Sequence, residues 1–582
     1  MWHYDPPLRD MRFVVDEVLG APDAWTAMSG FEDLDAGTAA QVLEQAGRFA
    51  AEVLAPINGP GDLEGCVLAD GRVSTPRGFR EAYQAFVDAG WPALACDPDC
   101  GGQGLPQLLN SALFEMLAAA NHAWTMYPGL LHGAYECLHA HARGAVRDTY
   151  LPRVTRGEWL STMCLTEAHA GSDLGLARTR AEPAADGSHR ITGGKIFISG
   201  GDHDLTPNIV HLVLARLPDA PSGTKGLSLF LVPKLLPGGA PNAVRCERLE
   251  HKMGLKGSAT CAMSFDGATG WLLGEPNRGL PAMFLMMNAA RLHVGLQGLG
   301  HLEMAAQNAL RYALERPQSR APRTPAPRSG GVADLIAHHP PVRRTLLELQ
   351  ARAQGGRVLA YWAAHALDEH ARHADAGARE AANERASLLT PIVKAVLTEF
   401  GHFGADRALG VWGGHGYVHE NGIEQSVRDS RVTLIYEGTN EIQAADLVVR
   451  KILPDAGAKF AALLDWAGAQ CEGSPHAAAA RARIDALRGA VAALHRDAAA
   501  DPELPYRAAD DLLFAAGEAL LGCAWARSDA LAARAIARGA ADARFYEDKR
   551  VLARFHFDWL GGEFARRLER VAAARCALPF VA

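Results

Sequence analysis

The feature that most constrains this chain is the change in hydrophobic periodicity along its length. Up to about residue 160, apolar residues recur at helical spacing, as in FREAYQAFVDAGW (79–91) and SALFEMLAAANHAW (111–124). From about 161 to 275 the pattern changes to short β-prone runs bounded by glycine and proline, such as NIVHLVLARL, GLSLFLVP and ATCAMSFDG. After Gly279 the helical period returns in long segments. The sequence therefore predicts a mainly α protein with a central β domain.

The same changes of pattern suggest a division into domains. At 582 residues the chain is too long for one hydrophobic core. We expect an N-terminal helical domain at 1–160, a middle β domain at 161–279, a helical bundle at 280–455 and an additional helical domain at 456–582. Inside the bundle, RAPRTPAPRSGG (320–331) is too rich in Pro, Arg and Gly to pack, and it is predicted to be an exposed loop.

Composition argues against several classes of protein. The chain is 48% hydrophobic and 21% charged, and no uninterrupted apolar run approaches the length of a bilayer span, which predicts a soluble protein without membrane insertion. The opening MWHYDPPLRDMRF carries charges where a secretory signal needs an apolar core. The ten cysteines lack a repeated spacing, and no second Cys/His pair accompanies Cys96 and Cys100 to complete a zinc site. We expect a cytoplasmic protein with reduced thiols and no metal site.

One carboxylate stands at an unusual place. In LIYEGTNEIQ (434–443) a short apolar run ends at Glu437, Gly438 breaks the pattern, and an amphipathic helix begins. Taken alone, Glu437 is best interpreted as a solvated turn residue or as an acid near the positive end of the next helix.

Several ordered segments change that interpretation because they resemble the successive signatures of the acyl-CoA dehydrogenases. They are CLTEAHAGSD (164–173), GGKIFISGG (193–201), GGHGY (413–417), VRDSR (427–431) and IYEGTNEIQ (435–443). The resemblance covers about residues 30–455. PLRDMRF, EHKMGLKGSAT (250–260) and the C-terminal extension are similar to a large bacterial subgroup of that family. The resemblance implies an α-helical N-terminal domain, a β-barrel middle domain and an α-helical bundle with a C-terminal helical extension, an FAD cofactor and a homodimer.

The implied reaction gives Glu437 a role. Desaturation of an acyl-CoA thioester needs a base on one face to remove the α proton and a hydride acceptor on the other. By resemblance Glu437 is the base, FAD accepts the β hydride, and the Glu437 backbone N–H with a flavin hydroxyl polarises the thioester carbonyl. Some branches of the family place the base immediately before an Arg that matches Arg291, a substrate-binding position, but this chain has Ala290 there. Glu437 is therefore the favoured candidate.

The resemblance also implies flavin contacts in the β domain. Thr166 matches a residue that touches the isoalloxazine ring, Ser172 one that binds the pyrophosphate, Phe197 an aromatic that packs on the flavin, and Ser199 a hydroxyl near its reactive nitrogen. Without the motifs, the hydroxyls would be ordinary turn residues and Phe197 a core aromatic of a strand. The family normally has Pro where this chain has Ala168.

Further cofactor contacts are implied in the bundle. Gly413 and Gly414 of GGHGY offer backbone to the pyrophosphate beside a helix start, and Thr439 follows the base. Arg316 matches an Arg that reaches the FAD of the neighbouring subunit, although a solvated charge at a helix end is nearly as good an interpretation. Where the family usually has a Gln that helps to hold the dinucleotide, this chain has Gly410.

Alternatives from other classes remain. One is a DNA-associated flavoprotein related to the family, but residues 456–582 carry 17 basic and 16 acidic residues, which gives no strong basic surface. Another is an interaction or membrane-surface role for the extension, yet Asp558, Glu563 and two glycines interrupt the amphipathic stretch 550–569. Within enzymes, the alternative is an acyl-CoA oxidase.

The expected substrate and partners rest on the resemblance alone. The subgroup implies a short or medium acyl chain, with a sulfur-containing chain as one candidate. It also implies an electron-transferring flavoprotein as electron acceptor. The net charge of −8 gives no general attraction to nucleic acid.

Overall fold

The computed structural model describes residues 2–323 and 331–581. The chain forms two compact units, one of Met1–Gly47 with Val294–Ala582 and one of Arg48–His293. Most of the loop predicted at 320–331 falls on residues 324–330, outside the described residues. None of the described helices combines the length and apolarity needed to cross a bilayer. The ten cysteines are free thiols, and seven of them are buried.

The first part of the Arg48–His293 unit is helical. Its helices are α4 (Ala55–Glu64), α5 (Phe79–Asp88), α6 (Gln107–Thr125), α7 (Leu131–His141) and α8 (Gly144–Thr155). Helix α6 is apolar on nearly all sides and is buried from Leu108 to Thr125, as a central helix should be. A short hairpin, β1 (Val67–Ala69) and β2 (Arg72–Ser74), interrupts the stretch that was predicted to be helical throughout.

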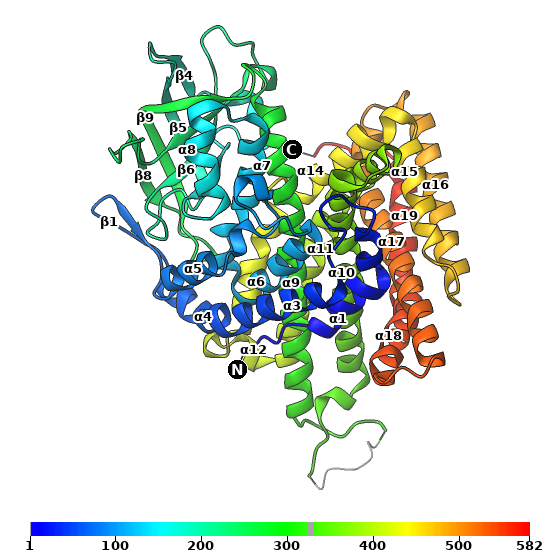
Figure 1. Cartoon of the computed structure of the whole chain (residues 1–582). Coiled ribbons are helices and arrows are strands. Elements are labelled where there is room, and N and C mark those ends of the chain that lie inside the picture. The colour runs from blue at the N-terminus through cyan, green and yellow to red at the C-terminus, as the bar shows by residue number, and fades with distance from the viewer. Residues whose placement is uncertain (1, 324–330, 582) are drawn as a thin grey trace. The chain divides into compact units, whose positions relative to one another are not determined.

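The predicted middle β domain is confirmed as a seven-stranded sheet, drawn in cyan and green in Figure 1. Its strands are β3 (Leu160–Cys164), β4 (Arg180–Pro183), β5 (His189–Ser199), β6 (Ile209–Ala215), β7 (Ser228–Pro233), β8 (Val244–Leu249) and β9 (Thr260–Leu273). The order is β3-β6-β7-β9-β5-β4, and β8 also pairs with β9. All pairs are antiparallel except β3 with β6. Every residue of β6 and β7 is buried, which explains why both read as continuous apolar runs.

The sheet also closes on itself. The Ala181 amide in β4 donates to the Arg216 carbonyl beyond the end of β6 at 2.8 Å, and the Arg216 amide donates to the Thr179 carbonyl at 2.8 Å. The last strand in this order, β4, therefore also contacts the end of β6, which is separated from it in the sheet by β7, β9 and β5. This closure agrees with the β-barrel that the family resemblance implies.

In the other unit, long helices form a bundle. They are α9 (Gly279–Glu315, in this unit from Val294), α10 (Pro340–Arg372), α11 (Ala376–Trp412), α13 (Ile423–Ser430) and α14 (Asn440–Ala445), with the short α12 (Gly414–Tyr417). Helices α9 and α11 meet backbone to backbone, because a Cβ at Gly298 would lie 2.4 Å from the Leu397 carbonyl oxygen, and one at Gly401 would lie 2.3 Å from the Gly298 oxygen. Glycine is required at this crossing.

The C-terminal extension is helical, as predicted. It comprises α15 (Ala458–Ala469), α16 (Ala477–Ala498), α17 (Leu504–Ala537), α18 (Ala543–Phe555) and α19 (Gly561–Ala573), drawn in yellow to red in Figure 1. Helices α16, α18 and α19 pack around α17. Trp525 of α17 donates from its indole N–H to the Ala351 carbonyl of α10 at 3.1 Å. The extension is thus packed directly on the bundle.

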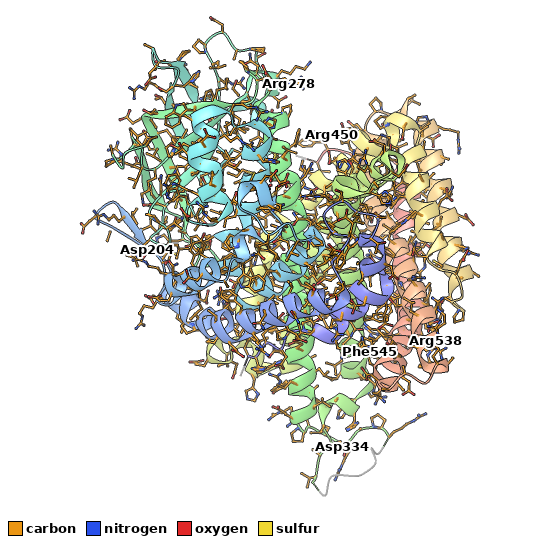
Figure 2. All side chains as sticks on the ribbon, viewed as in Figure 1. Asp204, Arg278, Asp334, Arg450, Arg538 and Phe545 are labelled. Carbon is orange, nitrogen blue, oxygen red and sulfur yellow. The ribbon has the colours of Figure 1, made fainter. Side chains whose placement is uncertain are left out.

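A buried ionic cluster joins the N-terminal segment to the helical bundle and to the C-terminal extension. The helices of this segment are α1 (Leu8–Arg12), α2 (Ala21–Trp25) and α3 (Ala36–Arg48). Asp10 binds Arg357 of α10 and Lys549 of α18. Arg357 also binds Glu303 of α9 at 2.7 Å. Phe13 packs edge-on against Phe545 of α18, labelled in Figure 2, with ring centroids 5.5 Å apart. The PLRDMRF segment therefore connects the bundle to the extension.

Candidate active site

Glu437 lies on a strained turn between a 3₁₀ turn, Arg431–Leu434, and helix α14. Glu437 has φ of 53° and Gly438 has φ of 83°, so two successive residues adopt the left-handed conformation. Glycine tolerates this conformation, whereas a residue with a side chain pays about 1–3 kcal/mol for such a strained backbone. A strained residue of this kind persists only where its surroundings hold it, and such residues gather at functional sites.

Buried donors hold both carbonyl oxygens of this turn. The Gln443 side-chain amide donates to the Glu437 carbonyl at 2.9 Å. The Lys394 ammonium, on α11, donates to the Gly438 carbonyl at 2.9 Å and to the Asn440 side-chain oxygen at 3.0 Å. Lys394 and Gln443 are completely buried. Sequence reasoning missed both residues; the available signal was a lysine within the apolar run TPIVKAVL, which α11 buries.

The residue before the candidate base is also fixed. The Tyr436 hydroxyl donates to the Gln297 side-chain oxygen of α9. Burial, and secondarily the Glu437 carboxylate, raise the pKa of Tyr436 well above its ordinary value. Tyr436 is therefore a neutral donor at physiological pH. Gln297 is a third residue that the sequence did not point to.

The other predicted site residues of this unit lie at element ends. Thr439 is the N-cap of α14, where its hydroxyl accepts from the Ile442 amide at 3.3 Å. Gly413 precedes α12 with φ of 59°, and a Cβ at Gly413 or Gly414 would meet nothing within 4 Å, so the backbone there is open to a ligand. Arg316 follows the last residue of α9 and is half-buried.

In the other unit, the predicted flavin contacts Thr166 and Phe197 lie on neighbouring segments. The Ile196 amide donates to the Thr166 carbonyl at 2.9 Å. The pairing of β5 with β9 shifts register between Lys195 and Ile198, and Phe197 in this bulge has φ of 59°. Its side chain is 60% exposed, so it is not the core aromatic of a strand. Ser199 is half-buried and pairs with Thr260 of β9.

A buried ion pair holds these two segments together. The Lys195 ammonium lies 2.9 Å from the Glu167 carboxylate and donates to the Leu165 carbonyl at 3.0 Å. Glu167 also accepts from the Thr179 hydroxyl at 2.7 Å and from the Arg178 amide at 2.8 Å. Burial alone would raise the pKa of Glu167, but the Lys195 charge and the hydrogen bonds outweigh burial and lower the pKa to about 2.

The loop that follows carries Ser172. The amides of Glu167 and Ala170 each donate to the other residue's carbonyl at 3.0 Å, so the turn is closed without the proline that Ala168 replaces. Ser172 is exposed beyond this turn. Arg291 lies in the same unit on α9, with only 7% of its surface exposed, next to the buried Ala290.

Family models match nearly the whole chain. Models described as the acyl-CoA dehydrogenase N-terminal, middle and C-terminal domains match residues 37–158, 162–268 and 277–452. A model described as acetyl-CoA dehydrogenase C-terminal like matches residues 456–578. The appended helices thus also have a counterpart among known domains.

Curated relatives cover most of the chain as well. The 3-methylmercaptopropionyl-CoA dehydrogenase of Ruegeria pomeroyi is 41% identical over 561 residues, which is 94% of each chain. The broad-specificity linear acyl-CoA dehydrogenase FadE5 of Mycobacterium tuberculosis is 38% identical over 478 residues, 79% of this chain and 77% of that one. Among solved structures, Caenorhabditis elegans ACDH-11 in complex with C11-CoA superposes with a TM-score of 0.76 at 19% identity, covering 95% of this chain and 91% of that one. At 19% identity, the similarity to ACDH-11 shows that the two chains share a fold.

Proposed function

This chain belongs to the acyl-CoA dehydrogenase family, and we propose that it is an FAD-dependent oxidoreductase that converts an acyl-CoA thioester to the trans-2-enoyl-CoA with Glu437 as the base. The observation that carries this proposal is the Glu437–Gly438 turn. Its strained backbone is held through both carbonyls by buried donors, which is the arrangement expected where a catalytic group must be oriented.

Glu437 removes the α proton of the substrate in this proposal. An α proton of a thioester is weakly acidic, so the carboxylate must act while the thioester oxygen receives hydrogen bonds that stabilise the developing enolate. The Glu437 backbone N–H is the donor that the chain itself supplies. FAD, when bound, supplies the acceptor for the β hydride.

The residues present fit a flavin dinucleotide. Phe197 offers an aromatic face that is 60% exposed and held out by a bulge. Gly413 and Gly414 offer open backbone without a side chain in the way, which suits a pyrophosphate. Thr166, Ser172, Ser199 and Thr439 add hydroxyls, and Arg316 adds a cation; these residues would hold the cofactor.

The substrate proposal comes from the relatives. The name of the Ruegeria protein specifies a thioether acyl chain, and FadE5 is named for linear acyl chains. We therefore propose a short or medium acyl chain, with the 3-(methylthio)propanoyl group as the first candidate, and Arg291 as a substrate-binding residue. An electron-transferring flavoprotein as electron acceptor and a homodimeric assembly complete the proposal by family analogy.

An anaerobic titration tests the reaction and names the substrate. The purified yellow protein is mixed with butanoyl-, octanoyl-, hexadecanoyl- and 3-(methylthio)propanoyl-CoA, and the oxidised flavin absorbance is followed. We expect bleaching by a short or medium thioester and a product that lacks two hydrogen atoms. If a flavin-loaded protein is bleached by none of these thioesters, the proposed reaction is wrong.

A further inference from the structure

We propose that Lys394 is a positioning residue, which acts through the turn and sets the orientation of the Glu437 carboxylate. This inference rests on the proposed role of Glu437 as the base. Lys394 lies on α11, 43 residues before Glu437 in the sequence, and its ammonium reaches the turn from the bundle interior.

A completely buried ammonium needs a reason to be there. Taking a lysine charge out of water is costly unless the ammonium is well hydrogen-bonded, and a helix position between buried Val393 and Ala395 would otherwise favour an apolar side chain. The hydrogen bonds to the Gly438 carbonyl and the Asn440 side-chain oxygen, at 2.9 and 3.0 Å, both end on the turn or on the first residue of α14. The two hydrogen bonds to the turn and to Asn440 thus explain why an ammonium group is buried at position 394.

The acceptor Asn440 is itself fixed. Its side-chain oxygen also accepts from the Thr398 hydroxyl, one turn further along α11, at 3.2 Å, and Asn440 is buried. Lys394 and Thr398 therefore present two donors from one helix face to the start of α14. A shift of the turn relative to α11 would break several hydrogen bonds in a buried setting.

The carbonyl of Glu437 is held by a residue that follows the turn in the sequence. Gln443 of α14 donates to the Glu437 carbonyl at 2.9 Å, and a Cβ at Gly438 would lie 2.8 Å from the same side-chain nitrogen. With the carbonyls of residues 437 and 438 both held, the planes of two successive peptides are fixed. The first of these planes begins at the Glu437 Cα, so it restricts the position and the direction from which the Glu437 side chain leaves the backbone.

Positioning of this kind has a measurable consequence. Displacing a reacting group by about 1 Å can cost about 100-fold in rate without weakening substrate binding. Lys394→Met removes the donor and keeps the approximate volume. We expect the limiting rate of flavin reduction at saturating acyl-CoA to fall by about 100-fold, while the flavin content and the half-saturating acyl-CoA concentration stay within about threefold of wild type.

Lys451→Met is the matched control. Lys451 also donates to a backbone carbonyl of α11, that of Ser387 at 2.7 Å. Ser387 lies seven residues, about two helical turns, before Lys394 on this helix. We expect this variant to reduce its flavin at the wild-type rate. If Lys394→Met does not fold, Gln443→Met, which removes the donor to Glu437, takes its place with the same expected outcome.

Glu437→Gln, measured in the same series, separates the inference from the function on which it rests. A Glu437→Gln variant that reduces its flavin at the wild-type rate overturns the proposed base. If Glu437→Gln is slow but Lys394→Met stays within threefold of wild type, only the positioning role is overturned. Equal losses in substrate affinity and in limiting rate for Lys394→Met would likewise overturn positioning in favour of a general structural role.

Discussion

The Lys195 ammonium lies 2.9 Å from the Glu167 carboxylate, and neither side chain is more than 5% exposed. Glu167 belongs to the loop that carries Thr166, and Lys195 belongs to the bulged strand that carries Phe197. The pair therefore connects the two segments of the proposed flavin site that lie in the β domain.

Breaking this pair is predicted to destabilise the protein. Glu167→Gln leaves the Lys195 charge buried without its counter-ion, so we expect a loss of about 3–5 kcal/mol in the free energy of unfolding. Denaturant unfolding followed by tryptophan fluorescence measures it. The control is Glu250→Gln, which breaks the more exposed pair with Arg248 and is expected to cost less than about 1 kcal/mol. Similar effects of the two variants would contradict the account of the buried pair.

The same pair predicts a dependence of stability on acid. The folded-state pKa of Glu167, about 2, is below its ordinary value of 4.5, so its stabilising contribution is complete above pH 4.5 and is lost as the pH falls towards 2. Thermal unfolding between pH 5 and pH 3 should therefore show a smaller decline for Glu167→Gln than for the wild type. Parallel declines would show that Glu167 does not titrate in this way.

The ionic cluster around Asp10 gives a third prediction. Burial would raise the pKa of Asp10, but the charges of Lys549 and Arg357 lower it, so the carboxylate is ionised. Asp10→Asn leaves two buried cations short of a partner, and we expect a loss of about 3–5 kcal/mol. Asp542→Asn is the matched control, since Asp542 pairs with Arg9 between the same two parts of the chain at the surface, at 3.1 Å. A loss as large in the control would contradict the role of the buried cluster.

Phe197 allows the cofactor to be tested apart from catalysis. The side chain is largely exposed, so Phe197→Ala should change the stability of the flavin-free protein little. Loss of aromatic stacking of about 1 kcal/mol should weaken FAD binding by about fivefold. Flavin fluorescence during titration of the flavin-free protein measures this, with Leu176→Ala, also more than half exposed in the same unit, as control. Unchanged FAD affinity in Phe197→Ala would remove Phe197 from the proposed flavin site.

Much of the fold followed from periodicity. Buried runs such as Ile209–Ala215 have no alternation, and long segments such as Ala376–Trp412 repeat at helical spacing, so element types were predictable. Periodicity does not give pairing, and the return of β4 to Arg216 was found only in the structure. The hairpin at 67–74 was missed because its strands are only three residues long.

The site was predicted less completely, and the reasons are local. The left-handed backbone of Phe197 and Glu437 has no sequence signal, because such conformations are rare for residues with side chains. The contacts of Lys394 with Gly438 and of Gln297 with Tyr436 join residues 44 and 139 positions apart. A polar residue in an apolar helix indicates that its side chain needs a hydrogen-bond partner, but only the packing of the folded chain shows which group that partner is.

The central claim is that Glu437 removes the α proton, and the rate of anaerobic flavin reduction by the best acyl-CoA tests it most directly. Glu437→Gln keeps the size of the side chain and removes its basicity. Since a positioned base contributes about 10²–10⁴-fold, we expect reduction to slow by at least about 100-fold, with FAD still bound and the thioester still binding. Reduction at the wild-type rate in a flavin-loaded Glu437→Gln protein would contradict the account.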